Sequence, residues 1–240
     1  MGGCLADVQC LHDRTIGVSN AFFYELEYQK TGAFTFRLYR AAYGNNQPFP
    51  NPDTSNDTER KKYPDYAHFA PDRARVVGGA DLTAGQQALA NAFAQRPEFI
   101  TKYPASLTLD QFVDAILATI KNDIGADLTI QRAALIALGS RGAVLYRLAN
   151  DDLAGGNAGI DNRAFLDADY NRTFVGTQYF GYLRRDGDIG GLIFWLGQIN
   201  SGPLRDGVKQ NAMVCSFITS DEYQKRFGPN SPRTNRECPQ

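Results

Sequence analysis

The amino-acid sequence predicts an all-α fold, an array of short helical units with no significant sheet. Apolar residues recur at helical spacing of three and four through most of the chain, and no segment alternates convincingly with the two-residue period of a strand. Caps, prolines and glycines cut this pattern into short pieces. One stretch, residues 45–63, is polar and punctuated by proline without any period, so we expect a long irregular loop there.

In the first half of the chain, each predicted helix is bounded by a cap or a breaker. The expected segments are 20–32, 34–43, 64–77, 84–95 and 97–103. The second of these should turn one face inward, formed by Phe34, Leu38, Tyr39 and Ala42, and end at Gly44. Pro97 stands in the first turn of the last segment, where its missing N–H costs nothing.

In the second half, Thr108 and Thr129 are each predicted to cap a helix. Residues 143–152 are predicted to form a further helix. The stretch 174–228 is the most complete unit. It should hold a helix up to Arg185, a second helix capped by an acid of the turn 186–188, and a third. The inward residues expected on the second are Leu192, Trp195, Leu196 and Ile199, and on the third Val208, Ala212, Cys215 and Ile218. Thr219 or Ser220 caps a short closing helix that ends at Gly228.

The two ends of this unit recur upstream, which indicates an internal repeat. Phe217, Glu222 and Tyr223 match Phe22, Glu27 and Tyr28 and also Phe93, Glu98 and Phe99. The opening helix recurs at Phe34, Phe112 and Phe174. Stacked repeats of this size form helical arrays. The predicted division is a lead-in with an incomplete first unit at 1–32, units at 33–104, 105–172 and 173–228, and a flexible tail at 229–240.

The repeated motif has an ordinary structural explanation. Its rings would be buried on one side, and Glu222 would lie in the first turn of the closing helix, where a carboxylate interacts favourably with the helix dipole and can close a capping box. The functional alternative is that Glu27, Glu98 and Glu222 are acid sites. We interpret Glu222 and Asp186 as caps, and Trp195 as part of the structural motif.

Composition and charge exclude several classes of protein. The formal net charge is −1 over 240 residues, which argues against nucleic acid or an anionic membrane as the main partner. No apolar run approaches the roughly 20 residues of a transmembrane helix, so no membrane span is expected. The N-terminus lacks the basic and apolar regions of a signal peptide. Either the chain is cytosolic, or its export signal lies elsewhere in a longer protein.

The four cysteines bear on that choice. They are Cys4, Cys10, Cys215 and Cys238, an even number without a C-x-x-C pair. Two disulfides are predicted, for example Cys4–Cys10 and Cys215–Cys238, although four cysteines allow three pairings. Four unpaired thiols in a cytosolic protein are the alternative, but a free thiol in the polar tail around Cys238 would be a liability.

The last unit resembles a bacterial family, the domain-of-unknown-function 4214 family, which is related to the phycobilisome-linker domain. The resemblance rests on Arg185-Asp186, on 191–195 (GLIFW) and on 217–223 (FITSDEY), and it is expected to extend over most of the chain. Members often carry proline where Gly187 stands, so a looser turn is expected. The first unit lacks its opening helix, as though the chain were a C-terminal piece. The resemblance implies a non-catalytic extracellular module for assembly or attachment, with no catalytic residues.

Residues that could carry chemistry are sparse. Asp186 and Asp188 occupy positions one and three of an EF-hand-like loop, but position twelve is Gly197, so they are weak calcium candidates and helix capping explains them equally. Cys4, Cys10 and His12 lack a fourth zinc ligand. His12 and His68 are the two histidines. The sequence therefore predicts no catalytic residue, no cofactor and no enzyme.

Three functions remain open from the sequence. The first is a structural or interaction module at the cell surface that binds other copies of itself or another surface protein. The second is a domain that binds a saccharide or another small molecule through tyrosines and the 45–63 loop, which makes a glycan a possible partner; an apolar cleft with convergent polar groups would favour it. The third is an uncharacterised enzyme, which would need clustered titratable groups.

Overall fold

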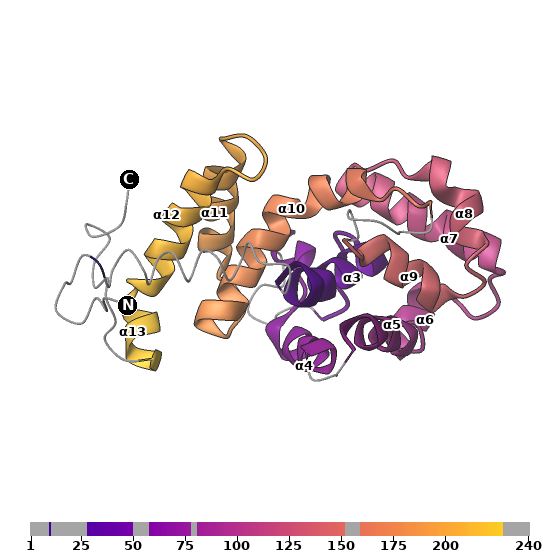
Figure 1. Cartoon of the computed structure of the whole chain (residues 1–240), viewed down its shortest axis with the longest axis horizontal. Helices are drawn as coiled ribbons and strands as arrows, with labels where there is room; N and C mark the ends of the chain where they lie inside the picture. Colours follow the sequence, from indigo (N-terminus) through magenta and orange to yellow (C-terminus); the bar gives the residue numbers. More distant parts are fainter. Residues whose placement is uncertain (1–9, 11–27, 50–57, 78–80, 152–158, 228–240) are drawn as a thin grey trace.

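The structure is a computed structural model that describes residues 10, 28–49, 58–77, 81–151 and 159–227. Within these residues every regular element is a helix and no strand occurs, which confirms the all-α prediction. The molecule is elongated (Figure 1). A larger lobe is formed by helices α3 to α9, and a smaller one at the C-terminal end by α11 to α13, with α10 running between them. Most of the helix expected at 20–32 lies outside the described residues.

The helices of the larger lobe lie mostly where the sequence predicts them. Their bounds are η1 Gln29–Ala33, α3 Phe34–Tyr43, η3 Arg60–Lys62, α4 Tyr66–Val77, α5 Leu82–Phe93, α6 Pro97–Lys102, α7 Leu109–Thr119, η4 Ile120–Ile124, η5 Thr129–Gln131, α8 Arg132–Ile136 and α9 Arg141–Ala149. Among these, η1 and η4 are π-helical and η3 and η5 are 3-10 helices. The predicted loop is irregular where it is described, apart from the single turn of η3.

The C-terminal part continues with α10 Arg163–Gln178, the π-helical η6 Tyr179–Leu183, α11 Ile189–Asn200, α12 Gly207–Ile218 and α13 Asp221–Phe227. Several predicted caps are confirmed. Thr108 forms a capping box with Gln111, α3 ends at Gly44, and Pro97 opens α6. Ser220 accepts a hydrogen bond from the backbone N–H of Tyr223 at 3.2 Å.

Several N-terminal boundaries were predicted wrongly. Helix α9 begins at Arg141, after the cap Ser140, rather than at residue 143, and in two further cases an aspartate is the reason. Helix α5 begins at Leu82 rather than at Ala84, because Asp81 caps it and accepts from the N–H of Ala84 at 3.1 Å. Thr129 caps nothing. The carboxylate of Asp127 accepts from its N–H at 2.9 Å, forming a turn that leads into the short 3-10 helix η5.

The apolar side chains form two cores. The first contains rings and aliphatic chains from α3, α5, α6, α7 and α9, together with Phe165 and Leu166 of α10. The second is built from the C-terminal half of α10 with η6, α11 and α12, and it includes Phe36, Tyr63 and Phe69 from earlier in the chain. The predicted units at 33–104 and 105–172 thus contribute to one common core.

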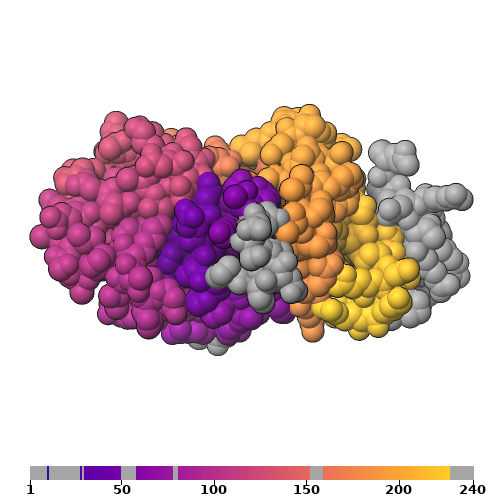
Figure 2. All heavy atoms as spheres, turned by 180° about the vertical axis from the view of Figure 1, so that it is seen from behind, coloured from indigo at the N-terminus to yellow at the C-terminus, as the bar shows by residue number. Residues whose placement is uncertain are grey.

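Helix α3 lies between the two cores and is buried along its whole length. Figure 2 shows the surface of the early part of the chain, in indigo and purple, between the later helices of the larger lobe and the C-terminal helices. Phe34 packs in the first core and Phe36 in the second. The expectation of a single inward face was therefore wrong for this helix. Its packing on α10 is close, since a Cβ atom added at Gly176 would lie 2.5 Å from the ring of Phe36.

Charged residues on α3 are buried because each has partners. The guanidinium of Arg37 donates to the carbonyl oxygen of Ala149 at 2.9 Å, and that of Arg40 pairs with Asp169 of α10, also at 2.9 Å. Arg40 further donates to the carbonyl oxygen of Lys62 at 2.8 Å. A buried charge is tolerated only when it is paired and hydrogen-bonded in this way.

One aromatic contact occurs in both cores, between residues at matching positions of the predicted repeat. Tyr39 and Phe93 pack edge to face with ring centroids 4.9 Å apart and planes at 89°. Tyr179 and Phe217 pack with the same centroid distance and planes at 83°. In each case the tyrosine comes from the opening helix of a unit and the phenylalanine from its closing motif. Edge-to-face packing is a favourable geometry for aromatic rings.

Candidate interaction surface

The helical hairpin α11–α12 is held in place by an acidic cap at the start of each helix. Asp188 accepts from the N–H of Gly191 at 2.8 Å, and Asp206 accepts from the N–H of Val208 at 3.0 Å. Both caps satisfy backbone donors that the first turn of a helix leaves unpaired. The prediction of an acidic cap before the second helix of this unit is thereby confirmed, with Asp188 as the residue.

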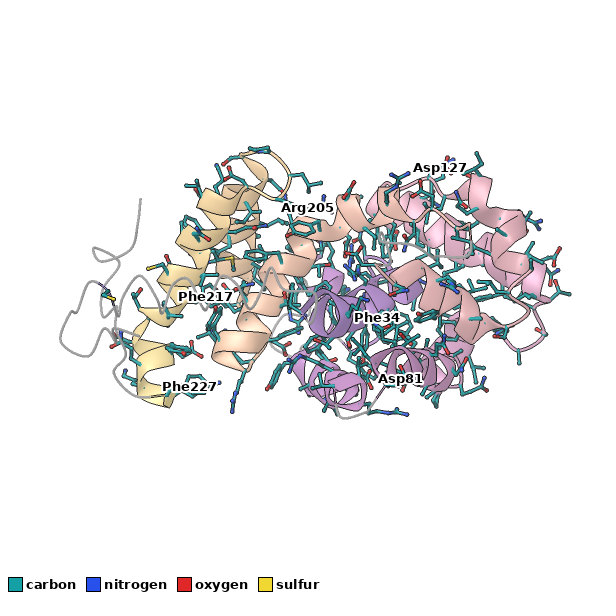
Figure 3. All side chains as sticks on the ribbon, in the orientation of Figure 1. Phe34, Asp81, Asp127, Arg205, Phe217 and Phe227 are labelled. Atoms are coloured by element: carbon teal, nitrogen blue, oxygen red, sulfur yellow. The ribbon has the colours of Figure 1, made fainter. Side chains whose placement is uncertain are left out.

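The inner side of the hairpin completes the second core. Leu192 and Ile199 of α11 are buried, and Phe217 of α12 projects towards α10 and η6 (Figure 3). Trp195 is only half-buried. Its ring lies 5.1 Å from that of Phe194 and 6.2 Å from that of Phe217, centroid to centroid, so it bridges the inner and outer sides of the hairpin.

The outer side of the hairpin exposes large apolar side chains. Ile193 and Phe194 of α11 are 56% and 55% exposed, Leu204 of the connecting loop 42%, and Val208 of α12 69%. The other strongly exposed apolar side chains of the described residues are scattered singly over the molecule. Single exposed apolar residues are normal, whereas these four belong to one hairpin and the loop that connects its helices. We call these four residues the hairpin surface.

Val208 and Ala212 were expected to point inward, but both are exposed. The buried side of α12 is formed by Gln210, Met213, Val214, Cys215, Phe217 and Ile218. Gln210 takes part in this side because its amide is hydrogen-bonded, at 3.4 Å to the hydroxyl of Tyr170. The polar residue therefore replaces Val208 on the inward side, and the apolar one is left in solvent.

The glycines of the hairpin serve different purposes. Gly187 is buried, and a Cβ atom there would lie 2.5 Å from Leu192, so the turn is closely packed rather than loose as expected. Gly197, by contrast, has nothing within 4 Å of an added Cβ. It lies one turn after Phe194 on the exposed side of α11, where the backbone itself is open to a partner.

The weak calcium candidates are engaged by protein donors. Asp186 accepts from the N–H of Tyr66 at 2.7 Å and pairs with the guanidinium of Arg60 at 2.5 Å. It thus ties the hairpin turn to the larger lobe instead of capping α11. Asp188 is the cap of α11, and Arg185 lies 3.7 Å from its carboxylate. The described residues contain no group of three or more histidine, cysteine or acidic side chains placed to hold a metal ion.

Glu222 lies in the first turn of α13, as predicted, but its carboxylate has a second role. It accepts two hydrogen bonds from Arg185, at 2.7 and 2.8 Å, and this pairing lowers the pKa of the Glu222 carboxyl. The bidentate geometry fixes α13 against the end of η6. Tyr223 is half-buried and packs on Tyr182, with ring centroids 5.9 Å apart.

The remaining motif residues serve the cores where the structure describes them. Tyr28, Phe93 and Phe99 are buried, and Glu98 is partly exposed. Phe22 and Glu27 lie outside the described residues, as do Cys4, Cys238 and His12. Neither Cys10 nor Cys215 is a free thiol. With one cysteine of each proposed pair undescribed, the pairing stays a prediction.

Sequence reasoning missed the buried ion pairs that link the elements. Arg172 of α10 pairs with Glu59, and its guanidinium lies 5.0 Å from the centroid of Tyr63. Arg96 pairs with Asp72 of α4 at 2.5 Å. No local pattern distinguishes these arginines from those in solvent, because their partners are distant in sequence. The sequence feature that could have indicated them is the presence of arginine in segments that are otherwise rich in apolar residues.

The fold and the hairpin surface define an all-α protein with two cores, in which one C-terminal hairpin is incompletely covered. Residues 167–227, which include this hairpin, match the family model described as a domain of unknown function, DUF4214. The match covers the last unit, whereas the resemblance was expected over most of the chain. No curated protein and no solved structure matches the chain. No described helix is long and apolar enough to cross a membrane.

Proposed function

We propose that this chain is a non-catalytic helical module that acts outside the cell, in self-assembly or attachment at the cell surface, and that the hairpin surface is its contact site. The observation that carries the proposal is the gathering of Ile193, Phe194, Leu204 and Val208 on one hairpin. Removing such side chains from water stabilises an association by roughly 25 cal/mol for each Å² of apolar area.

The occupant we propose for this surface is a second copy of the chain. Helix α11 has no charged residue in its twelve positions, so two copies can face each other without like-charge repulsion. A two-fold contact of this kind would bring the same patch of both copies together, so that each contact between two residues occurs twice. Gly197 would allow the two backbones to approach closely.

Extracellular location is supported by the state of the cysteines. The two described cysteines, Cys10 and Cys215, are not free thiols, and disulfides persist in oxidising compartments. Mass spectrometry of the intact chain with and without reductant should give a gain of four hydrogens on reduction. A mass that does not change would contradict the two proposed disulfides, and with them the argument for export.

The non-catalytic assignment is supported by the use of the charged groups. The carboxylates of Asp169, Asp186 and Glu222 are each committed to an arginine that joins two elements. Side chains used in this way hold helices together. The proposal therefore assigns them a structural role and no reaction.

Self-assembly is tested by the concentration dependence of molar mass. Light scattering of the full chain should show a mass above that of the monomer that falls on dilution, and Phe194→Glu should shift the protein to monomer. Ile130→Glu is the matched control, since Ile130 is 89% exposed and lies on η5 of the other lobe. A wild-type protein that stays monomeric at high concentration would contradict the proposal. So would an Ile130→Glu variant that dissociates as much as Phe194→Glu does.

A further inference from the structure

A pocket away from the hairpin surface lies where α4 meets η1 and η6. Its volume is about 340 Å³, at the lower end of the range typical of small-molecule sites. It is lined by Tyr28, Gly32, Tyr66, Phe69, Ala70, Arg73, Thr177, Phe180, Gly181 and Arg184. The lining comes from three parts of the chain that are distant in sequence, so the pocket is a product of the tertiary fold.

The walls of the pocket are aromatic. Phe180 packs against Phe69 at 4.6 Å and against Tyr66 at 5.7 Å, centroid to centroid, so these rings support one another. The hydroxyl of Tyr28 is hydrogen-bonded to that of Thr177 and is buried, so it is part of the framework. Gly32 keeps a gap open between the ring of Tyr28 and Arg73, because a Cβ atom there would lie 3.3 Å from that ring. Flat rings of this kind favour a flat ligand.

Two arginines supply the charge of the pocket. Neither Arg73 nor Arg184 has a carboxylate partner among the described residues, and the described lining contains no acidic side chain. This differs from Arg40, Arg96 and Arg185, each of which is paired with a carboxylate. An unpaired guanidinium offers a planar set of donors that matches a carboxylate group.

The backbone at Arg184 points to the same conclusion. Its φ is 49° and ψ 43°, a left-handed conformation that glycine adopts at far lower cost. The π-helical segment η4 ends in the same way at Gly125, with a φ of 86°. At the end of η6 an arginine that lines the pocket occupies the costly position, and its guanidinium lies 4.9 Å from the centroid of Phe227.

We propose that this pocket binds a small carboxylate carried on a flat ring. The ring would lie against Tyr66, Phe69 and Phe180, and the carboxylate would accept hydrogen bonds from Arg73 and Arg184. Aromatic acids have both features, whereas acidic sugars share the carboxylate but carry it on a puckered ring. The near absence of free hydroxyl or amide groups in the lining favours the aromatic acid, because a sugar needs partners for its own hydroxyls.

Calorimetric titration of the full chain tests the proposal with three probes: 2-naphthoate, its neutral analogue 2-naphthalenemethanol, and glucuronate. Naphthoate should bind at one site and at least tenfold more tightly than the neutral alcohol. Tighter binding of glucuronate than of naphthoate would keep the carboxylate site and assign the acidic sugar as its source. Failure of both acids to bind at millimolar concentration would overturn the proposal.

Variants locate the binding in the pocket. Arg73→Gln and Arg184→Gln should each weaken naphthoate about tenfold or more, and Ala70→Trp should block it by filling the space. Arg205→Gln is the matched control, because it removes the same charge from another non-glycine residue with positive φ, outside the pocket. Circular dichroism checks that every variant is folded. Equal binding by wild type, Arg205→Gln and the double variant Arg73→Gln/Arg184→Gln would refute the assignment, as would tight binding by Ala70→Trp.

Discussion

The two cores contain the same aromatic contact, but the surroundings of that contact are covered to different degrees. In the larger lobe, Tyr39 and Phe93 are fully buried and other helices cover both rings. In the smaller lobe, the equivalent pair of Tyr179 and Phe217 is buried, yet its neighbour Trp195 is only partly buried. The first core is complete within one chain. The second core leaves apolar side chains exposed on the hairpin surface.

The difference is explained by the number of layers. Phe93 contacts Phe99, with ring centroids 6.1 Å apart, and Phe99 contacts Phe112, with centroids 5.8 Å apart. The ring cluster of the larger lobe therefore continues inward. Beyond Phe217, the rings lead to Trp195 and the hairpin surface in one direction and to Tyr182, Tyr223 and the partly exposed Phe227 in the other, so both paths end at the surface. In stacked repeats each unit is covered by its neighbours, and the hairpin surface is a side that the described neighbours leave open.

The largest effect should come from breaking the aromatic contact itself. Phe93→Ala should lower the free energy of unfolding by about 3–5 kcal/mol, because a rigid surrounding core cannot collapse into the cavity. Phe217→Ala should cost less, about 3 kcal/mol or below, since the partly open hairpin can relax. Urea denaturation followed by circular dichroism measures both values. A larger loss for Phe217→Ala would reverse the comparison of the two cores.

The buried ion pair between the lobes should be next in size. Asp169→Asn removes the charge partner of Arg40, and breaking one side of a buried pair costs about 3–5 kcal/mol. We expect the lower end, because Arg40 keeps the carbonyl oxygen of Lys62 as an acceptor. Asp167→Asn is the control: it affects an exposed pair with Arg205 and should cost about 0–1 kcal/mol. Equal losses would show that the Arg40 pair is unimportant.

A smaller effect should appear as a pH dependence in the larger lobe. Burial lowers the pKa of Lys102 to about 8 from 10.5, so the folded protein binds fewer protons than the unfolded one between these values. Stability contributed at this site should therefore rise as pH increases from about 8 to 10.5, by about 1–2 kcal/mol given the partial exposure of the group.

Comparing the unfolding free energies of wild type and Lys102→Met isolates the rise in stability that is due to Lys102. Burial raises the pKa of Tyr43 and Tyr103 in the folded state, so their ionisation in the unfolded chain lowers stability above pH 10 in both proteins. Subtracting the unfolding free energies of the variant from those of the wild type at each pH removes this tyrosine contribution. A flat difference between pH 7.5 and 10 would contradict the expected shift.

The smallest predicted effect sharpens the question of whether the lobes unfold together. Thr108→Ala in the larger lobe and Asp188→Ala in the smaller should each cost about 1 kcal/mol, the usual effect of losing an N-cap. Because α3 contributes to both cores, we expect one thermal transition that shifts in both variants. Calorimetry of the full chain measures it. Two transitions, each moved by one variant only, would show independent lobes.

The helices and many of their ends could be predicted from sequence, because caps such as Thr108, breakers such as Gly44 and the position of Pro97 act locally. The inward side of α12 and the burial of α3 could not. Val208 is exposed and Arg37 is buried for reasons that depend on residues more than a hundred positions away or on neighbouring helices. The pocket escaped prediction for the same reason, since its lining is assembled from three separate parts of the chain.

The position of α3 restricts how this chain can be divided. Phe36 lies in the second core, so a fragment beginning at residue 167 would lack a ring that packs on Phe180 at 6.2 Å, centroid to centroid. A fragment ending before α10 would lose Asp169, the partner of Arg40. Although the family match covers only the last unit, that unit is not a transferable module in this protein: recombination or a cloning boundary between the lobes would leave both parts unfinished.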